Sequence, residues 1–106
     1  MNKDYIVLGG VRLRVEANWN ALMAFLKEQG RDDVQGLSSL ASISPSEFSS
    51  LMAACINEGE RLDGRNAEYT ALKVGEMCGI AEVGEFLAIY NRQTSPQLQP
   101  AEEKKD

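Results

Sequence analysis

The sequence predicts an α+β fold that is predominantly α, in which an N-terminal two-stranded β-hairpin packs on a small bundle of four to five helices. Three observations predict this class. Residues 5–15 alternate in character on either side of Gly9-Gly10, apolar residues further along recur at helical spacing, and helix-capping residues separate those runs. With 106 residues, of which 43% are hydrophobic, we expect one domain over 1–94 and a polar C-terminal tail over 95–106.

The hairpin is expected to join strands at about 4–8 and 11–16. A two-residue glycine loop favours a type I′ or II′ turn, because glycine adopts positive φ without steric cost. This loop length sets the register, so one face of the hairpin is apolar and needs a helix to cover it. The apolar face comprises Ile6, Leu8, Val11, Leu13 and Val15. The other face comprises Tyr5, Val7, Arg12 and Arg14.

The first helix is expected to follow the N-cap Asn18 and to run to about Gln29, with Gly30 ending it. Its apolar side chains follow the helical period: Trp19, Leu22, Met23, Phe25 and Leu26. Because Trp19 and Phe25 are large, we expect them to cover the apolar face of the hairpin. After a polar loop, a short helical turn is expected to dock three side chains on the core: Leu37, Leu40 and Ile43.

The second helix begins with the most specific local signal in the chain, the stretch SPSE. Ser44 is the N-cap, Pro45 occupies the first helical position and Glu47 completes a capping box. The helix is expected to run to Gly64, with Gly59 weakening its last turn. Its apolar face comprises Phe48, Leu51, Met52, Cys55, Ile56 and Leu62.

Two further helices are expected before the tail. Asn66 is the expected cap of the first of them, whose apolar residues are Tyr69, Leu72, Val74, Met77 and Cys78. Gly79 separates it from the last helix, which has Ile80, Val83, Leu87 and Tyr90 along one face, with Phe86 and Ile89 beside them. After Thr94, prolines and polar residues predict a solvated tail.

The sequence offers few candidates for common catalytic chemistry, with carboxylate pairs as the ones that remain. There is no histidine, which excludes a Ser-His or Cys-His nucleophile. Gly9-Gly10 precedes a strand rather than a helix, so it does not form a phosphate-binding loop. The carboxylates at 58, 60, 76, 82 and 85 are expected on solvated helix faces. We therefore expect no enzyme, no cofactor and no metal site.

Charge and hydropathy limit the partner classes. The net charge is −5 and the basic residues form no stripe, so a nucleic-acid partner is not expected. No apolar run reaches the ~18 residues of a membrane span, and we expect no membrane partner. Cys55 and Cys78 are expected as reduced thiols, with a disulfide as the alternative, and the expected location is the cytoplasm.

The outer face of the hairpin allows two interpretations. The stems of Arg12 and Arg14 can simply cover Tyr5 and Val7 while their charged ends stay in water. Alternatively these four residues bind a partner protein, because Tyr and Arg are enriched where interfaces concentrate binding energy. Both outer edges of the hairpin are also expected to be free to accept another strand.

The order of the segments resembles one known family. After the hairpin come RVEANWNALMAFLKEQG, SPSEFSSLMAACINEG, ALKVGEMCG and IAEVGEFLAIYNRQ. This order is similar to that of the tail assembly chaperones of long-tailed phages and prophages, over residues 4–92. Members often carry an acidic residue in an ALxxLE pattern, whereas here ALMAFLKE places Glu28 one position later.

The resemblance implies a non-enzymatic protein of the bacterial host cell's cytoplasm. Such a protein binds apolar helical segments of the tape measure protein during tail morphogenesis, and some also engage the tail tube protein. One alternative is a phage structural component that self-associates through hairpin edges. Another is DNA binding by a helix pair within 66–92, which the carboxylates at 76, 82 and 85 disfavour by repelling phosphate.

Overall fold

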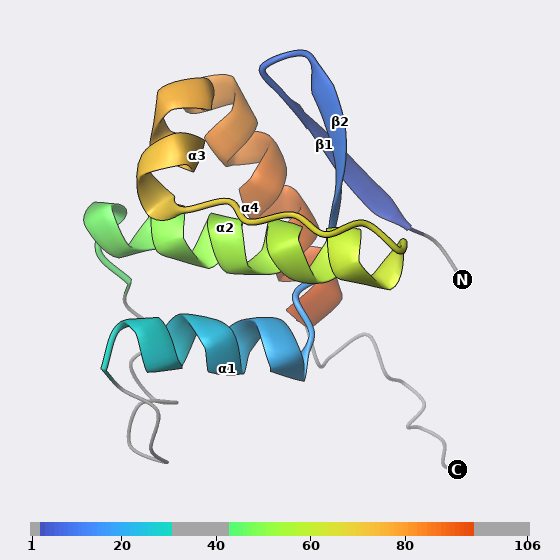
Figure 1. Cartoon of the computed structure of the whole chain (residues 1–106). Coiled ribbons are helices and arrows are strands. Elements are labelled where there is room, and N and C mark those ends of the chain that lie inside the picture. Colours follow the sequence, from blue (N-terminus) through green and yellow to red (C-terminus); the bar gives the residue numbers. More distant parts are fainter. Residues whose placement is uncertain (1–2, 31–42, 95–106) are drawn as a thin grey trace, which may run out of the picture.

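The computed structural model describes residues 3–30 and 43–94 and confirms the predicted α+β class with mostly helical structure. Within these ranges an N-terminal antiparallel hairpin is followed by four helices (Figure 1). The elements are β1 (Asp4–Leu8), β2 (Val11–Val15), α1 (Trp19–Glu28), α2 (Pro45–Leu62), α3 (Ala71–Met77) and α4 (Ile80–Thr94). The predicted docking of Leu37 and Leu40 and the predicted tail 95–106 lie outside the described residues.

The hairpin has the predicted register, with Ile6 opposite Leu13 and Leu8 opposite Val11. Gly9 and Gly10 both adopt positive φ, 57° and 81°, as the two-residue turn requires. Four residues of the predicted apolar face are buried: Ile6, Leu8, Leu13 and Val15. Val11 is a correction, because it is half exposed and lines an open hollow beside residues 66–69.

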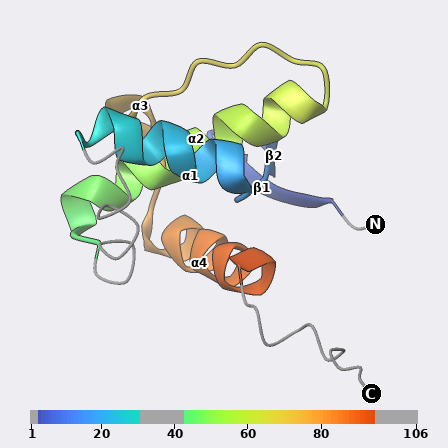
Figure 2. The same ribbon diagram turned by 90° about the horizontal axis from the view of Figure 1, so that it is seen from below.

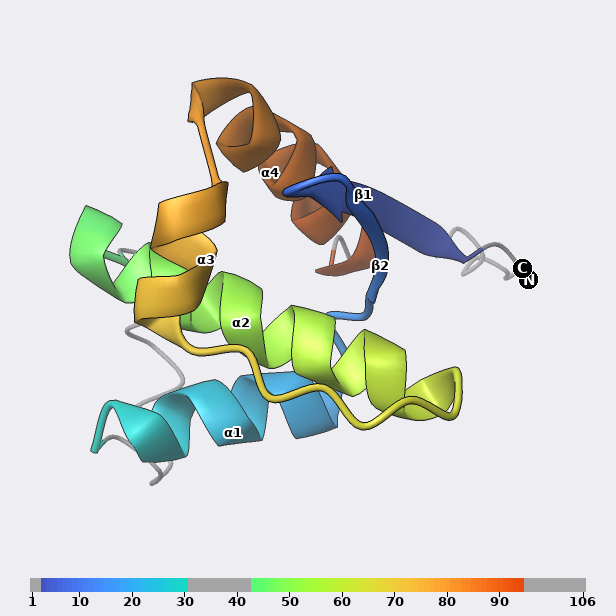
Figure 3. The same cartoon turned by 45° about the horizontal axis from the view of Figure 1, so that its top comes forward.

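Helix α2 lies at the centre of the molecule, between the hairpin and α1 (Figures 1 and 3). The apolar face of the hairpin therefore packs on α2 below β2 and on α4 below β1. The expectation that Trp19 and Phe25 cover the hairpin is wrong, since α2 separates α1 from it. Phe25 is buried against the other side of α2, and the side chain of Trp19 is 56% exposed.

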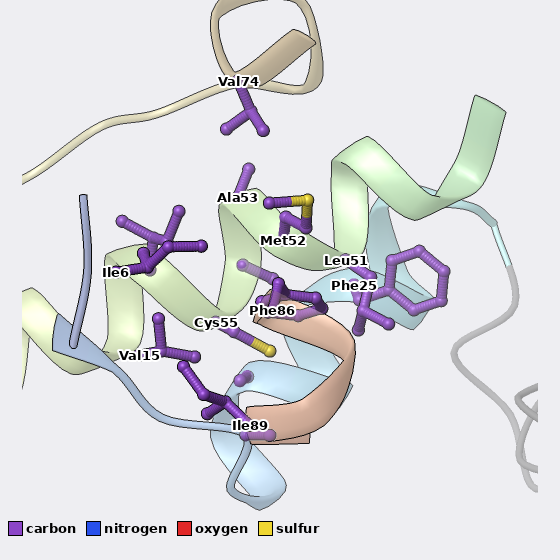
Figure 4. Packing of buried hydrophobic residues seen from close by; sticks show 14 of the residues in the cluster. Ile6, Val15, Phe25, Leu51, Met52, Ala53, Cys55, Val74, Phe86 and Ile89 are labelled. Atoms are coloured by element: carbon purple, nitrogen blue, oxygen red, sulfur yellow. The ribbon is translucent and has the colours of Figure 1, made fainter. Parts of the chain in front are cut away.

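The core lies where α1, α2, α4 and the hairpin meet (Figure 4). Phe86 of α4 is fully buried and makes an edge-to-face contact with Phe48 of α2, with ring centroids 5.4 Å apart. Both cysteines are free thiols. Cys55 is buried in this core, and the burial raises the pKa of its thiol to about 12, which keeps it protonated.

Three predicted details of the helices are corrected. Helix α2 ends at Leu62, just before Gly64 as predicted, but Leu62 is 44% exposed although it was expected on the apolar face. The N-cap of α3 is Thr70, whose hydroxyl accepts from the Lys73 N–H at 3.2 Å, and not Asn66. In α4 the buried residues are Phe86 and Ile89, whereas Ile80 is exposed. Among the described residues, no helix combines the length and apolar character needed to span a bilayer.

Candidate functional site

The predicted surface on the hairpin is divided by a contact with the end of α2. Asp63, the C-cap of α2, accepts from the Tyr5 hydroxyl at 3.2 Å and from Arg14 Nη1 at 2.7 Å. Tyr5 and Arg14 are thus engaged in holding the hairpin to α2. Val7 and Arg12 remain exposed, and the Arg12 guanidinium lies 3.9 Å from the centroid of the Tyr5 ring.

Glu58 and Glu60 are buried, which corrects the expectation of a solvated helix face. Glu60 accepts from the backbone N–H of Arg14 at 2.9 Å and from Arg65 Nε at 2.6 Å. Glu58 accepts from Asn18 Nδ2 at 2.8 Å, and Asn18 in turn caps α1. The two carboxylates therefore join α2 to β2 and to the start of α1, which is a structural role.

These contacts close the C-terminal part of the outer edge of β2. Besides the bond from Arg14 to Glu60, the N–H of Glu16 donates to the Cys55 carbonyl at 3.0 Å. Gly59 lets the two backbones approach, because a Cβ at this position would lie 2.2 Å from the Arg14 carbonyl oxygen. The expectation that both hairpin edges are free is thus wrong for β2.

Ion pairing lowers the pKa of two of these carboxyls. The hydrogen bond from Arg14 is the main cause for Asp63, whose pKa falls to about 2, and Lys3 adds to it. The hydrogen bonds from Arg61 are the main cause for Glu58, whose pKa also falls to about 2 in spite of burial. Both groups are therefore charged at neutral pH and hold their partners as carboxylates.

We expect the thermal stability of the protein to fall between pH 4.5 and about 2. Both carboxyls have a lower pKa in the folded than in the unfolded chain. Their contribution is therefore complete above the unfolded pKa and is lost as the pH falls through the folded one. Circular dichroism melting curves across this range measure the effect.

Glu58→Gln should make the melting temperature less dependent on pH in this range. Glu76→Gln is the matched control, because the side chain of Glu76 is exposed and bonds to none of the described residues, so the wild-type profile should persist. A wild-type melting temperature that stays constant down to pH 2 would contradict the assigned ion pairs.

An apolar groove lies between the first half of α2 and α4, and we call it the α2–α4 groove. It has a volume of about 460 Å³. Its lining comprises Ile43, Pro45, Phe48, Leu51, Val83, Leu87, Tyr90 and Asn91. Tyr90 is partly buried there, which raises the pKa of its phenol and keeps it neutral. Leu87 is 40% exposed. A solvent-exposed groove lined by such side chains can bind the apolar side chains of a partner.

Helix α1 carries two further exposed apolar residues, Trp19 and Met23. Asn20, Ala24 and Glu28 line a hollow of about 270 Å³ on the flank of α1 that faces residues 64–70. Helix periodicity places the exposed Trp19 and Met23 on the opposite flank. Figure 2 shows residues 64–70 and α4 on opposite sides of the layer formed by α1 and α2. Trp19 and Met23 therefore lie on the flank of α1 that is turned away from residues 64–70.

The start of α1 is also tied directly to the end of α4. The side-chain oxygen of Gln93 accepts from the backbone N–H of Ala17 at 2.6 Å, two residues before Trp19. The amide nitrogen of Gln93 donates to Asp4 at 2.8 Å. The C-terminal end of α4 is thereby fixed to both the hairpin and α1, while the flank that lines the groove stays open.

The remaining hollows are more polar. The one beside α1 is rimmed by Glu58, Arg61 and Arg65, whose charges are already paired with one another or with Glu60. Across residues 3–30 and 43–94, no cluster of three or more acidic or cysteine side chains is arranged to hold a metal ion. Comparisons of the chain with protein-family models, curated proteins and solved structures found no match.

Sequence reasoning placed the apolar residues of the α2–α4 groove on helix faces but did not identify the groove. Periodicity correctly places Val83, Leu87 and Tyr90 on one face of α4, but it does not show that this face is left half covered. One signal was present. Together with Phe86 and Ile89, these residues form an apolar arc wider than a helix needs to pack against a single neighbour.

Proposed function

We propose that this protein is a non-enzymatic binding protein that takes an apolar helical segment of another protein into the α2–α4 groove. The observation that carries the proposal is the groove itself, which is lined almost wholly by apolar side chains. Binding of an amphipathic helix in such a groove is a common mode of recognition. The bound helix inserts its side chains at positions i, i+3 or i+4, and i+7 into the groove.

The surroundings of the groove support a helical occupant. The groove has α2 and α4 as its walls, and α1 carries two further exposed apolar side chains, Trp19 and Met23. A helix in this position would pack its apolar stripe on Phe48 and Leu87. Methionine adapts its shape to varied apolar surfaces, so Met23 suits binding of segments that differ in sequence.

The resemblance to tail assembly chaperones names the partner we propose. The segment would come from a tape measure protein, kept soluble in the cytoplasm of the bacterial host during tail assembly, with the tail tube protein as a second partner. Reversible binding with no cofactor is sufficient for this role. An apolar stretch that lies in the groove is withdrawn from water, and so from aggregation with other copies.

The test is a titration of the full chain with a fluorescein-labelled amphipathic helical peptide from a tape measure protein. Leu87→Glu should weaken binding about tenfold or more, because it would put a charge against the apolar stripe of the bound helix. Leu87 is partly exposed, so the variant should fold, which a melting curve checks.

Leu72→Glu is the matched control, because Leu72 is 74% exposed on α3 and does not line the groove. It should bind the peptide as the wild type does. The proposal fails if wild-type protein does not bind the peptide, or if Leu72→Glu and Leu87→Glu weaken binding equally.

A further inference from the structure

The outer edge of β1 is open. The N–H of Arg14 donates away from the hairpin to Glu60, so Arg14 and its cross-strand neighbour Tyr5 form a pair that is not hydrogen bonded. Alternation along the strand makes Val7 and Arg12 a second such pair. The backbone groups of Tyr5 and Val7 therefore point outward from β1, and no described residue bonds to them. An unpaired strand edge is a template for another strand.

The strand is complementary to itself in an antiparallel arrangement centred on Ile6. In that register Tyr5 faces Val7 of the second copy, and Ile6 faces its own equivalent. An aromatic residue opposite a β-branched one is a favourable cross-strand pair. Asp4 would face Leu8 and Lys3 would face Gly9, so no like charges meet along the edge. The exposed side chain of Val7 would be covered.

Helix α4 runs antiparallel to β1, as Figures 1 and 3 show. Its end is fixed by the ion pair of Arg92 with Asp4, and Met77, which precedes α4, contacts Gly9 at the turn. A strand advances about 3.3 Å per residue and a helix about 1.5 Å. Moving from Asp4 to Ile6 thus corresponds to about four helical residues, which places Ala88 beside Ile6.

The flank of α4 near β1 is also complementary to itself about the same point. Glu85, Ala88 and Arg92 lie on one exposed flank, at helical spacing, away from the groove. A two-fold axis near Ala88 brings each Glu85 within about one residue's rise, ~1.5 Å along the helix, of the level of Arg92 of the second copy. Glu85 has no ion-pair partner among the described residues, and Arg92 is 54% exposed beside Asp4. The small side chain of Ala88 permits close approach of two helices.

We propose that the chain forms a two-fold symmetric dimer in which β1 pairs antiparallel with β1 of a second copy, centred on Ile6, and α4 packs on its equivalent, centred on Ala88. A single two-fold axis gives hydrogen-bond partners to the outward backbone groups of β1 and also pairs Glu85 with Arg92 across the two copies of α4. The α2–α4 groove lies on the other flank of α4, so the dimer is independent of the proposed function and leaves both grooves open. A partner with two apolar segments would then bind with avidity.

Sedimentation equilibrium of the full chain over a concentration series tests the strand pairing. Wild-type protein should show a monomer–dimer equilibrium. Val7→Pro should raise the dimer Kd about tenfold or more, because it removes one outward donor from each copy but no hydrogen bond within the hairpin. Arg12→Pro is the matched control. The N–H that it removes points out of the β2 edge, which takes no part in the dimer, so this variant should keep the wild-type Kd.

A charge exchange on α4 tests the helix contact without altering the hairpin backbone. Glu85→Arg alone and Arg92→Glu alone should each dimerise more weakly than wild type, because like charges face each other. An equimolar mixture of the two should regain dimer, since every facing pair is again Glu with Arg. The proposal is overturned if the wild type is monomeric throughout, if both proline variants shift the Kd alike, or if the mixture shows no recovery.

Discussion

Replacing Gly59 with alanine is expected to destabilise the fold by about 3 kcal/mol or more, the upper end of what overpacking costs. The added Cβ would lie 2.2 Å from the carbonyl oxygen of Arg14, which belongs to the backbone, and the Cβ itself is fixed to the backbone of α2. Neither can move aside as a side chain would, so α2 must separate from β2. Alanine's better helix propensity returns only about 1 kcal/mol.

The separation would also stretch two hydrogen bonds that hold the edge of β2, from Arg14 to Glu60 and from Glu16 to the Cys55 carbonyl. Urea unfolding measures the loss. Gly84→Ala is the matched control, because it too lies within a helix but no atom lies within 4 Å of its Cβ position. It should stabilise by about 0.5–1 kcal/mol. Equal effects of the two changes would contradict the close contact of α2 with β2.

Phe86→Ala is expected to cost about 3–5 kcal/mol, as removal of a buried phenylalanine ring does. The ring is fully buried and contacts Phe48 edge to face and Tyr90 in a stacked arrangement, with centroids 5.4 and 5.9 Å away. Small domains have a total stability of about 5–15 kcal/mol. The variant should therefore lie close to its unfolding midpoint in mild urea and should lose the α2–α4 groove.

Leu87→Ala is the control for this substitution, one residue further along α4. Leu87 is partly exposed, so the loss should stay near 1 kcal/mol or below. Urea unfolding of both variants gives the comparison. If Phe86→Ala costs no more than Leu87→Ala, then α4 does not dock on α2 as described.

Local signals were sufficient to predict much of the fold. The glycine turn determines the register of the hairpin because it leaves only two residues in the loop, and the pairing of Ile6 with Leu13 follows. The capping box at Ser44 and Glu47 marks the start of α2, and both of its hydrogen bonds form. Both signals act within a few residues of the chain, so tertiary packing does not alter them.

Long-range contacts explain what could not be predicted. Glu58 and Glu60 look like an ordinary charged helix face, and only the approach of β2 and Asn18 makes them buried acceptors. In the sequence alone Gly59 looks like a residue that weakens the helix. Its role in the close approach of α2 to Arg14 of β2 is seen only in the folded chain. The candidate site depends on the same kind of information, because periodicity predicts an apolar face on α4 and cannot show which part of it another element covers.

The surface predicted from the sequence and the surface favoured by the structure are different. Of the four hairpin residues, Tyr5 and Arg14 hold Asp63, which leaves Val7 and Arg12 exposed. The proposed groove is lined almost wholly by apolar side chains and lies between α2 and α4, on the flank of α4 away from β1. The hairpin instead offers its β1 edge, which we assign to self-association. The two surfaces can be tested separately because they lie on opposite flanks of α4.

The most direct measurement of the central proposal, that the α2–α4 groove binds an apolar helix, is a methyl NMR titration. The chain would carry labelled Ile, Leu and Val methyl groups and be titrated with the tape measure peptide. We expect the methyl signals of Leu51, Val83 and Leu87 to shift with the peptide, while those of Leu72 and Val11 stay in place. Shifts confined to Leu72 or Val11, or no shifts at saturating peptide, would contradict it.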